Sequence, residues 1–85
     1  MQVKQTFATE HYIIYHIRDK RKEKGISQRE LENRCDFAGG FIGKVESPNS
    51  RAKYNINHVV KICEVIGCSL WDIIPEWPPK HKTKI

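Results

Sequence analysis

Residues 25–46, GISQRELENRCDFAGGFIGKVE, decide the fold. Ser27 is followed three residues later by Glu30, the spacing of a capping box, which predicts a helix that begins just after Ser27. Leu31 is the main apolar anchor of this helix, which is expected to end near Arg34. The first half of the stretch therefore predicts one short, capped helix.

The second half of the stretch predicts another short helix close behind. Phe41, Ile42 and Val45 recur at i, i+1 and i+4 on one helical face, and a Ser-Pro pair at 47–48 ends the pattern. The turn between the two helices is expected to span about three residues. Asp36 in this turn tolerates a left-handed conformation. Two short helices joined by such a turn form a helix-turn-helix.

Helical patterns also flank this stretch on both sides. A first helix is expected to begin at the N-cap Thr9 and to stop at Gly25. A strongly apolar fourth helix is expected over 55–67 and a last short helix over 70–74. The sequence therefore predicts an all-α fold of five helices, with the helix-turn-helix at helices two and three.

Length and composition indicate one small domain with two arms. The chain has 85 residues, of which 39% are hydrophobic and 29% charged, so a second core is not expected. Residues 9–75 are the expected domain, residues 1–8 an N-terminal arm, and residues 76–85 a basic, proline-containing tail. Residues 3–7 could also pair as an edge strand in a dimer.

The charge balance and the missing motifs narrow the class of protein. Fifteen Lys and Arg against ten Asp and Glu give a net charge of +5, which favours a polyanionic partner. Neither the histidines nor the cysteines have the spacing of a metal site, and no catalytic motif is visible. We expect no enzyme activity, cofactor, metal or small-molecule ligand. The sequence shows no signal-peptide core or long apolar run, which predicts a cytoplasmic protein without a membrane partner.

Four landmarks recur along the chain in a fixed order and spacing. They are residues 17–21, 25–31, 42–46 and 59–74. In these landmarks the chain resembles the lambda repressor and Cro type helix-turn-helix family, also called the XRE family, over roughly residues 12–75. The resemblance implies a five-helix, lambda-repressor-like DNA-binding domain.

The resemblance assigns roles to residues that position the helix-turn-helix. Ser27 and Gln28 match positions whose backbone amides and glutamine side chain grip a DNA phosphate. Arg21 and Glu46 match an arginine and a glutamate that form an ion pair, with the arginine facing a phosphate. The alternatives are an exposed polar residue beside a helix cap for Gln28 and two unpaired surface charges for the pair.

The recognition positions implied by the resemblance carry little side-chain chemistry here. They are Ala38, Gly39, Gly40, Gly43 and Lys44, and only Lys44 reaches a base edge. Three glycines in a helix would cost about 3 kcal/mol of helix propensity. Two interpretations stay open. Either the backbone approaches DNA closely, with amides on phosphates and Phe37 or Ala38 on thymine methyl groups, or the helix no longer mainly reads bases.

Two more residues depart from the pattern where helices two and three approach each other. Glu32 occupies a position that is commonly alanine in similar proteins, and Asp36 one that is commonly glycine. The expected solution is a Glu32 side chain that leans outward and an Asp36 backbone in the left-handed region.

A polar loop after helix three carries further candidate DNA contacts. They are Asn49, Arg51, Lys53 and Tyr54. In similar proteins this segment lies along the DNA backbone, and cations, hydroxyls and amides are the usual phosphate ligands. The alternative is a loop that is merely solvated.

The C-terminal region holds a candidate dimer interface. Trp71, Ile74 and Trp77, together with Ile73, could form an exposed apolar patch of the kind found at such interfaces. Alternatively, the tail folds back and buries both tryptophan rings.

The leading functional expectation is a sequence-specific, DNA-binding transcriptional regulator that occupies an operator on double-stranded DNA, as a homodimer. The alternative is an antitoxin-like or accessory protein-interaction module with weak DNA binding, in which the glycine-rich helix contacts a protein. An apolar face over helix three would favour the alternative, whereas loop cations and Gln28 on one face would favour DNA.

Overall fold

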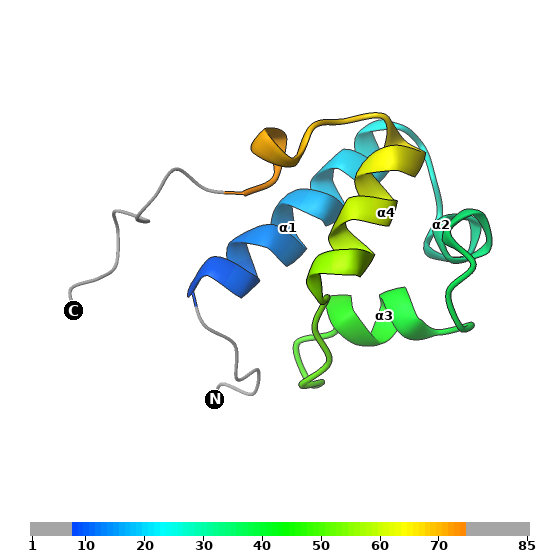
Figure 1. Cartoon of the computed structure of the whole chain (residues 1–85). Helices are drawn as coiled ribbons and strands as arrows, with labels where there is room; N and C mark the ends of the chain where they lie inside the picture. Colours follow the sequence, from blue (N-terminus) through cyan, green and yellow to red (C-terminus); the bar gives the residue numbers. More distant parts are fainter. Residues whose placement is uncertain (1–7, 75–85) are drawn as a thin grey trace.

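A computed structural model describes residues 8–74, whose regular structure is entirely helical (Figure 1). The elements are α1 Ala8–Glu23, α2 Gln28–Cys35, α3 Phe41–Glu46, α4 Ile56–Ile66 and the 3-10 helix η1 Leu70–Asp72. The all-α prediction is confirmed for this range. The fifth helix is a single 3-10 turn that ends before residue 74. Of the predicted N-terminal arm at residues 1–8, only Ala8 is described, and it begins α1; the predicted tail and Trp77 lie outside the described residues.

Local capping explains most of the helix boundaries. The Ser27 hydroxyl accepts a hydrogen bond from the Glu30 backbone amide at 3.0 Å and starts α2. The Glu30 carboxylate does not complete the predicted capping box, because it pairs with Arg34 one turn on. Thr9, the expected N-cap of the first helix, lies inside α1. At the end of α4, Gly67 adopts a left-handed conformation with φ of 83°, as a helix C-terminus favours.

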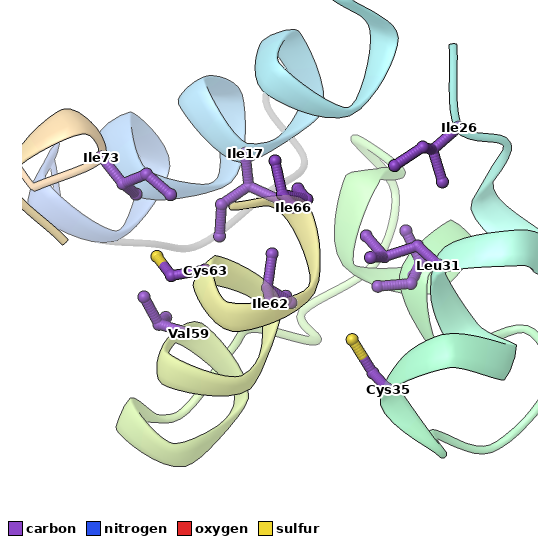
Figure 2. Packing of buried hydrophobic residues seen from close by; sticks show 10 residues of the cluster. Ile17, Ile26, Leu31, Cys35, Val59, Ile62, Cys63, Ile66 and Ile73 are labelled. Atoms are coloured by element: carbon purple, nitrogen blue, oxygen red, sulfur yellow. The ribbon is translucent and has the colours of Figure 1, made fainter. Parts of the chain in front are cut away.

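A single apolar core joins the helices (Figure 2). Ile17 of α1, Leu31 of α2, Ile42 of α3 and Ile62 of α4 are each completely buried. Ile73, just after η1, is also completely buried, so it does not belong to the predicted exposed patch. Each such side chain contributes about 1.5 to 3 kcal/mol by leaving water, which makes these positions the main source of stability.

The helices are arranged so that α3 is held by two others. Figure 1 shows α1 and α4 lying side by side, with α3 crosswise near the start of α4. Helix α3 packs against both α1 and α2. An aromatic cluster lies at the junction with α4, where the ring of Phe41 is 4.6 Å from that of His58 and 5.8 Å from that of Tyr54. The orientation of α3 therefore depends on contacts from the whole domain.

The turn between α2 and α3 is longer than predicted. It spans residues 36–40, and Asp36 begins it with φ of 64°, the only non-glycine residue at positive φ in the described part of the chain. Gly40 ends the turn with φ of 87°. Ala38, Gly39 and Gly40 thus precede α3, and only Gly43 lies within it. The expected loss of about 3 kcal/mol of helix propensity is therefore wrong. Glycines in a turn do not lower the stability of a helix, so only Gly43 contributes, with a cost of about 1 kcal/mol.

Candidate functional site

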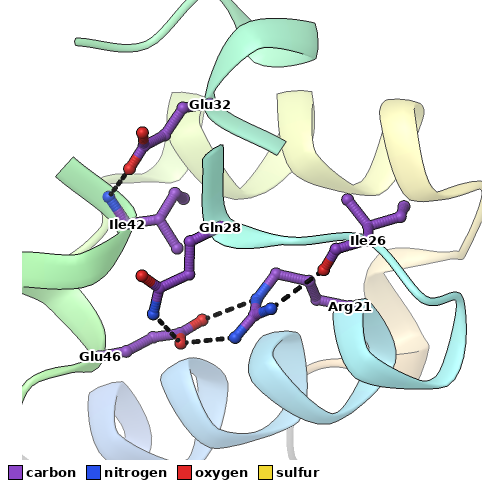
Figure 3. A network of polar contacts seen from close by, with 6 residues as sticks. All are labelled: Arg21, Ile26, Gln28, Glu32, Ile42 and Glu46. Carbon is purple, nitrogen blue, oxygen red and sulfur yellow. Dashed lines mark hydrogen bonds and ion pairs between the residues drawn. The ribbon is translucent and has the colours of Figure 1, made fainter. Parts of the chain in front are cut away.

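Arg21 of α1 and Glu46 of α3 form a two-contact ion pair (Figure 3). Arg21 Nη2 donates to Glu46 Oε1 at 2.8 Å, and Arg21 Nε donates to Glu46 Oε2 at 3.2 Å. Both side chains are almost fully buried, with 7% and 5% of their surface exposed. A planar guanidinium facing both carboxylate oxygens is a geometrically specific contact. The pair therefore fixes the C-terminal end of α3 against α1.

Arg21 points into the domain rather than toward solvent. Its Nη1 donates to the backbone carbonyl of Ile26 at 3.0 Å, so the guanidinium also holds the segment between α1 and α2. The family resemblance implied that Arg21 faces a DNA phosphate. The structure corrects this assignment, because a buried group with three internal contacts acts as a positioning residue and not as a surface contact.

Gln28 extends the same network to the surface. Its side-chain Nε2 donates to Glu46 Oε1 at 2.9 Å, and Figure 3 shows the amide directed at the ion pair. Gln28 is nevertheless exposed. A side-chain amide has two N–H donors, so one remains for an external acceptor while the other holds Glu46. Gln28 thus joins the rigid network to whatever binds outside it.

Glu32 holds the opposite end of α3 (Figure 3). Its carboxylate accepts hydrogen bonds from the backbone amides of Gly40 at 3.1 Å and Ile42 at 2.9 Å. Glu32 is only 5% exposed, so the expected outward orientation is wrong. The N-cap residue of α3, Gly40, has no side chain to satisfy these amides. A negative charge is also favourable at a helix N-terminus, which explains why this carboxylate turns inward.

The Glu32 contacts limit how the turn before α3 can bind a ligand. The amides of Gly40 and Ile42 are engaged by Glu32, and that of Phe41 donates to the Ala38 carbonyl. These three backbone amides are therefore not available as donors for the phosphate contacts that were predicted at the start of α3. Ala38, Gly39 and Gly40 remain exposed as a surface of small residues.

Gly43 and Lys44 are the recognition positions that lie on α3 itself. A Cβ atom at Gly43 would lie 3.2 Å from Gln28 Oε1, closer than most such contacts. The missing side chain therefore leaves room for Gln28 to reach Glu46. The Lys44 side chain is exposed and makes no hydrogen bond or ion pair within residues 8–74. Its long chain is the one cation on α3, and it points to solvent.

The loop after α3 divides into exposed and internal residues. Asn49 and Arg51 are exposed, as contacts with a DNA backbone would require. Lys53 Nζ instead lies 3.3 Å from Glu10 Oε1 of α1, an ion pair that a phosphate would have to compete with.

The Tyr54 hydroxyl is buried and has no hydrogen-bond partner among the described residues. Burial raises the pKa of Tyr54, and the nearby charge of Glu46 raises it further. Tyr54 is therefore an internal residue, which corrects its assignment as a phosphate ligand.

Besides Tyr15 on α1, large apolar side chains are exposed at two places on the described surface. Trp71 is 83% exposed, and Ile74 is half-buried. On α4, Ile56 is 73% and Val60 is 41% exposed. Their spacing of four residues puts both on one side of α4. This exposure could have been found from the sequence of α4, because its apolar stripe is wider than the side of the helix that faces the core.

The described residues offer no metal site or membrane span. No group of three or more His, Cys, Asp or Glu side chains could hold a metal ion in the range 8–74. None of the helices in that range is both long and apolar enough to cross a bilayer.

All three cysteines are free thiols, and burial raises the pKa of Cys63 to about 12, with help from a hydrogen bond with Cys68. A thiol with a raised pKa is a poor nucleophile.

The sequence and structure were compared with protein-family models, with curated proteins and with solved structures, and none of the three comparisons finds a match.

Proposed function

We propose that this protein is a sequence-specific DNA-binding transcriptional regulator with a lambda-repressor-like, five-helix domain. The observation that carries the proposal is the network of Arg21, Glu46 and Gln28. It fixes a short helix, α3, against α1 and brings an amide donor to the surface beside that helix. A domain that reads DNA needs such a rigid element at its surface, because readout depends on the register of a helix in the major groove.

Exposed polar groups near α3 support DNA as the ligand. Lys44 on α3 offers a donor for the guanine acceptors in the major groove. Gln28 at the start of α2, with Asn49 and Arg51 in the following loop, offers contacts for phosphates. The chain's charge of +5 attracts a polyanion over a longer range. In this account phosphate contacts contribute most of the affinity, and Lys44 contributes the base preference.

A homodimer completes the proposal. One copy offers a single long base-reading side chain, whereas a two-fold pair would read two half-sites about one helical turn apart. Trp71 supports an interface at the C-terminal end of the domain, because a tryptophan with 83% of its surface exposed is costly to leave in water.

A protein-interaction module is the second candidate function. It is favoured by the absence of long side chains on residues 38–40 and by the exposed Ile56 and Val60 on α4. In this alternative a protein partner packs on the small-residue surface, and DNA binding is weak or absent.

Selection from random duplex DNA by the purified protein separates the two candidates. We expect one recurrent site to be enriched, and the selected duplex to bind more tightly than a scrambled duplex of equal composition, by at least about a thousandfold. A selection that enriches no site would reject sequence-specific binding and would favour the protein-interaction module.

A further inference from the structure

A groove of about 520 Å³ lies beside the recognition helix, between α1 and α3. One wall is a stripe on α1 formed by His11, Ile14, Tyr15 and Arg18. The opposite wall is formed by Gly43 and Glu46 of α3 and by the two residues after this helix, with Gln28 at the rim. We call this feature the α1–α3 groove. It continues the exposed surface of α3, because Gly43 belongs to both.

The charges in the α1–α3 groove favour an anion. Glu46 lines it, but its carboxylate is already held by Arg21 and Gln28. Arg18 is exposed and has no ion-pair partner in the described part of the chain. Arg18 therefore supplies a guanidinium with a positive charge that is available to a ligand. The second N–H of the Gln28 amide is a further donor on the same side.

The groove also presents an aromatic surface beside these donors. Tyr15 is 52% exposed and lines the groove, so part of its ring is available to a ligand there. Its ring contacts His16 edge-on at 5.9 Å, which helps to fix its orientation. On the opposite wall, Gly43 has no side chain that would project into the groove, and a Cβ atom there would crowd Gln28. An apolar ring next to an anion donor matches the alternation of deoxyribose and phosphate along a nucleic-acid strand.

We propose that the α1–α3 groove receives the sugar–phosphate backbone of one DNA strand, with a phosphate on Arg18 and Gln28 and a deoxyribose against the ring of Tyr15. The proposal rests on the proposed function and deepens it, because it adds α1 to the DNA-binding surface. A strand in this groove runs directly beside Gly43, which leaves Lys44 facing the neighbouring bases.

Two substitutions of equal charge test the role of Arg18. Arg18→Gln removes a cation that lines the groove, whereas Lys22→Gln removes an exposed cation of α1 that does not. We expect Arg18→Gln to reduce the dependence of log K on log salt by about 0.9, the value for one phosphate contact. Lys22→Gln is expected to leave this slope unchanged. Thermal melts of both variants check that folding is equal.

Tyr15→Ala tests the apolar contact separately. The change removes no charge, so we expect affinity for duplex DNA to fall about threefold to tenfold with no change in the salt slope. Tyr15→Phe keeps the ring and is expected to bind like the wild type. If Arg18→Gln and Lys22→Gln have the same slope, or if Tyr15→Ala binds like the wild type, the groove does not hold the strand, although DNA binding itself would stand. If the wild type binds no duplex, the proposed function fails, and the groove proposal fails with it.

Discussion

The carboxylate of Glu32 accepts a hydrogen bond from the backbone amide of Ile42 at 2.9 Å, and this contact ties α2 to the start of α3. Glu46 ties the other end of α3 to Arg21 on α1. Helix α3 is only six residues long, too short to be stable by itself. Two buried carboxylates, one at each end, therefore hold the helix that the proposed function requires to be rigid.

Loss of the Glu32 carboxylate should destabilise the domain. Glu32→Ala leaves the amides of Gly40 and Ile42 without an acceptor, and we expect a loss of about 2 to 3 kcal/mol in the free energy of unfolding. Glu32→Gln keeps one acceptor oxygen and should lose less. Urea unfolding measures both variants, with the exposed Glu23→Ala as the control. Equal stability of Glu32→Ala and Glu23→Ala would contradict the capping role.

Arg21 and Glu46 should be energetically coupled. We expect Arg21→Ala and Glu46→Ala each to destabilise the domain by about 3 kcal/mol, because each leaves the other charge buried and unpaired. The double variant should cost less than the sum of the two single changes. Thermal melts of the four proteins give the coupling energy, and simple additivity would mean that the two residues act independently.

Removal of the Tyr54 hydroxyl should not harm the domain. The hydroxyl is buried without a hydrogen-bond partner among the described residues, so Tyr54→Phe is expected to stabilise the fold by up to about 1 kcal/mol. Tyr15→Phe, at an exposed ring, is the matched control and should be neutral. A loss of stability in Tyr54→Phe would show that the hydroxyl makes a favourable contact after all.

The same tyrosine should make stability sensitive to alkaline pH. The pKa of Tyr54 is raised above 10.0 by burial, so above pH 10 the unfolded chain loses a proton that the folded chain keeps. Stability from this group is complete below pH 10 and falls as pH rises further, by up to about 1.4 kcal/mol per pH unit. Cys63 acts in the same direction between pH 9.0 and about 12. The fall in Tm above pH 10 should be less steep in Tyr54→Phe than in the wild type, and equal slopes would contradict the shift.

Base reading and phosphate binding should separate in three variants, two at lysines and one at an arginine. Lys44→Ala should cost about 1 to 3 kcal/mol on the preferred site and little on unrelated DNA. Arg51→Ala should weaken every duplex alike and lower the salt slope by roughly one. Lys53→Ala should have a smaller effect on the slope than Arg51→Ala, because Glu10 already pairs with Lys53. Titrations of selected and scrambled duplexes compare the three variants, and uniform losses in Lys44→Ala would make it another phosphate contact.

The helical framework could be predicted because its signals are local. The caps at Ser27 and Asn55, and the left-handed residues Asp36 and Gly67, each lie within a few positions of the boundary that they set. The ion pair of Arg21 and Glu46 was accessible only through the family resemblance, since 25 residues separate the two side chains. Such spacing has no local signature.

The polar contacts that depend on packing could not be predicted. Glu32 was expected to lean outward because a buried carboxylate is costly unless it is paired. Its partners are backbone amides on another helix, and their position follows from the five-residue turn rather than from any sequence pattern. Tyr54 was assigned to the surface for a related reason. Polar loops usually face solvent, but the aromatic contact with Phe41 draws this ring inward.

The salt dependence of binding to the selected duplex tests whether the protein binds DNA through phosphate contacts and still recognises one sequence. We expect log K to fall linearly with log salt, with a slope of about 0.9 for each phosphate contacted, and the selected duplex to stay preferred over the scrambled one at every salt concentration. Binding that does not change with salt, or that does not distinguish the two duplexes, would contradict the account.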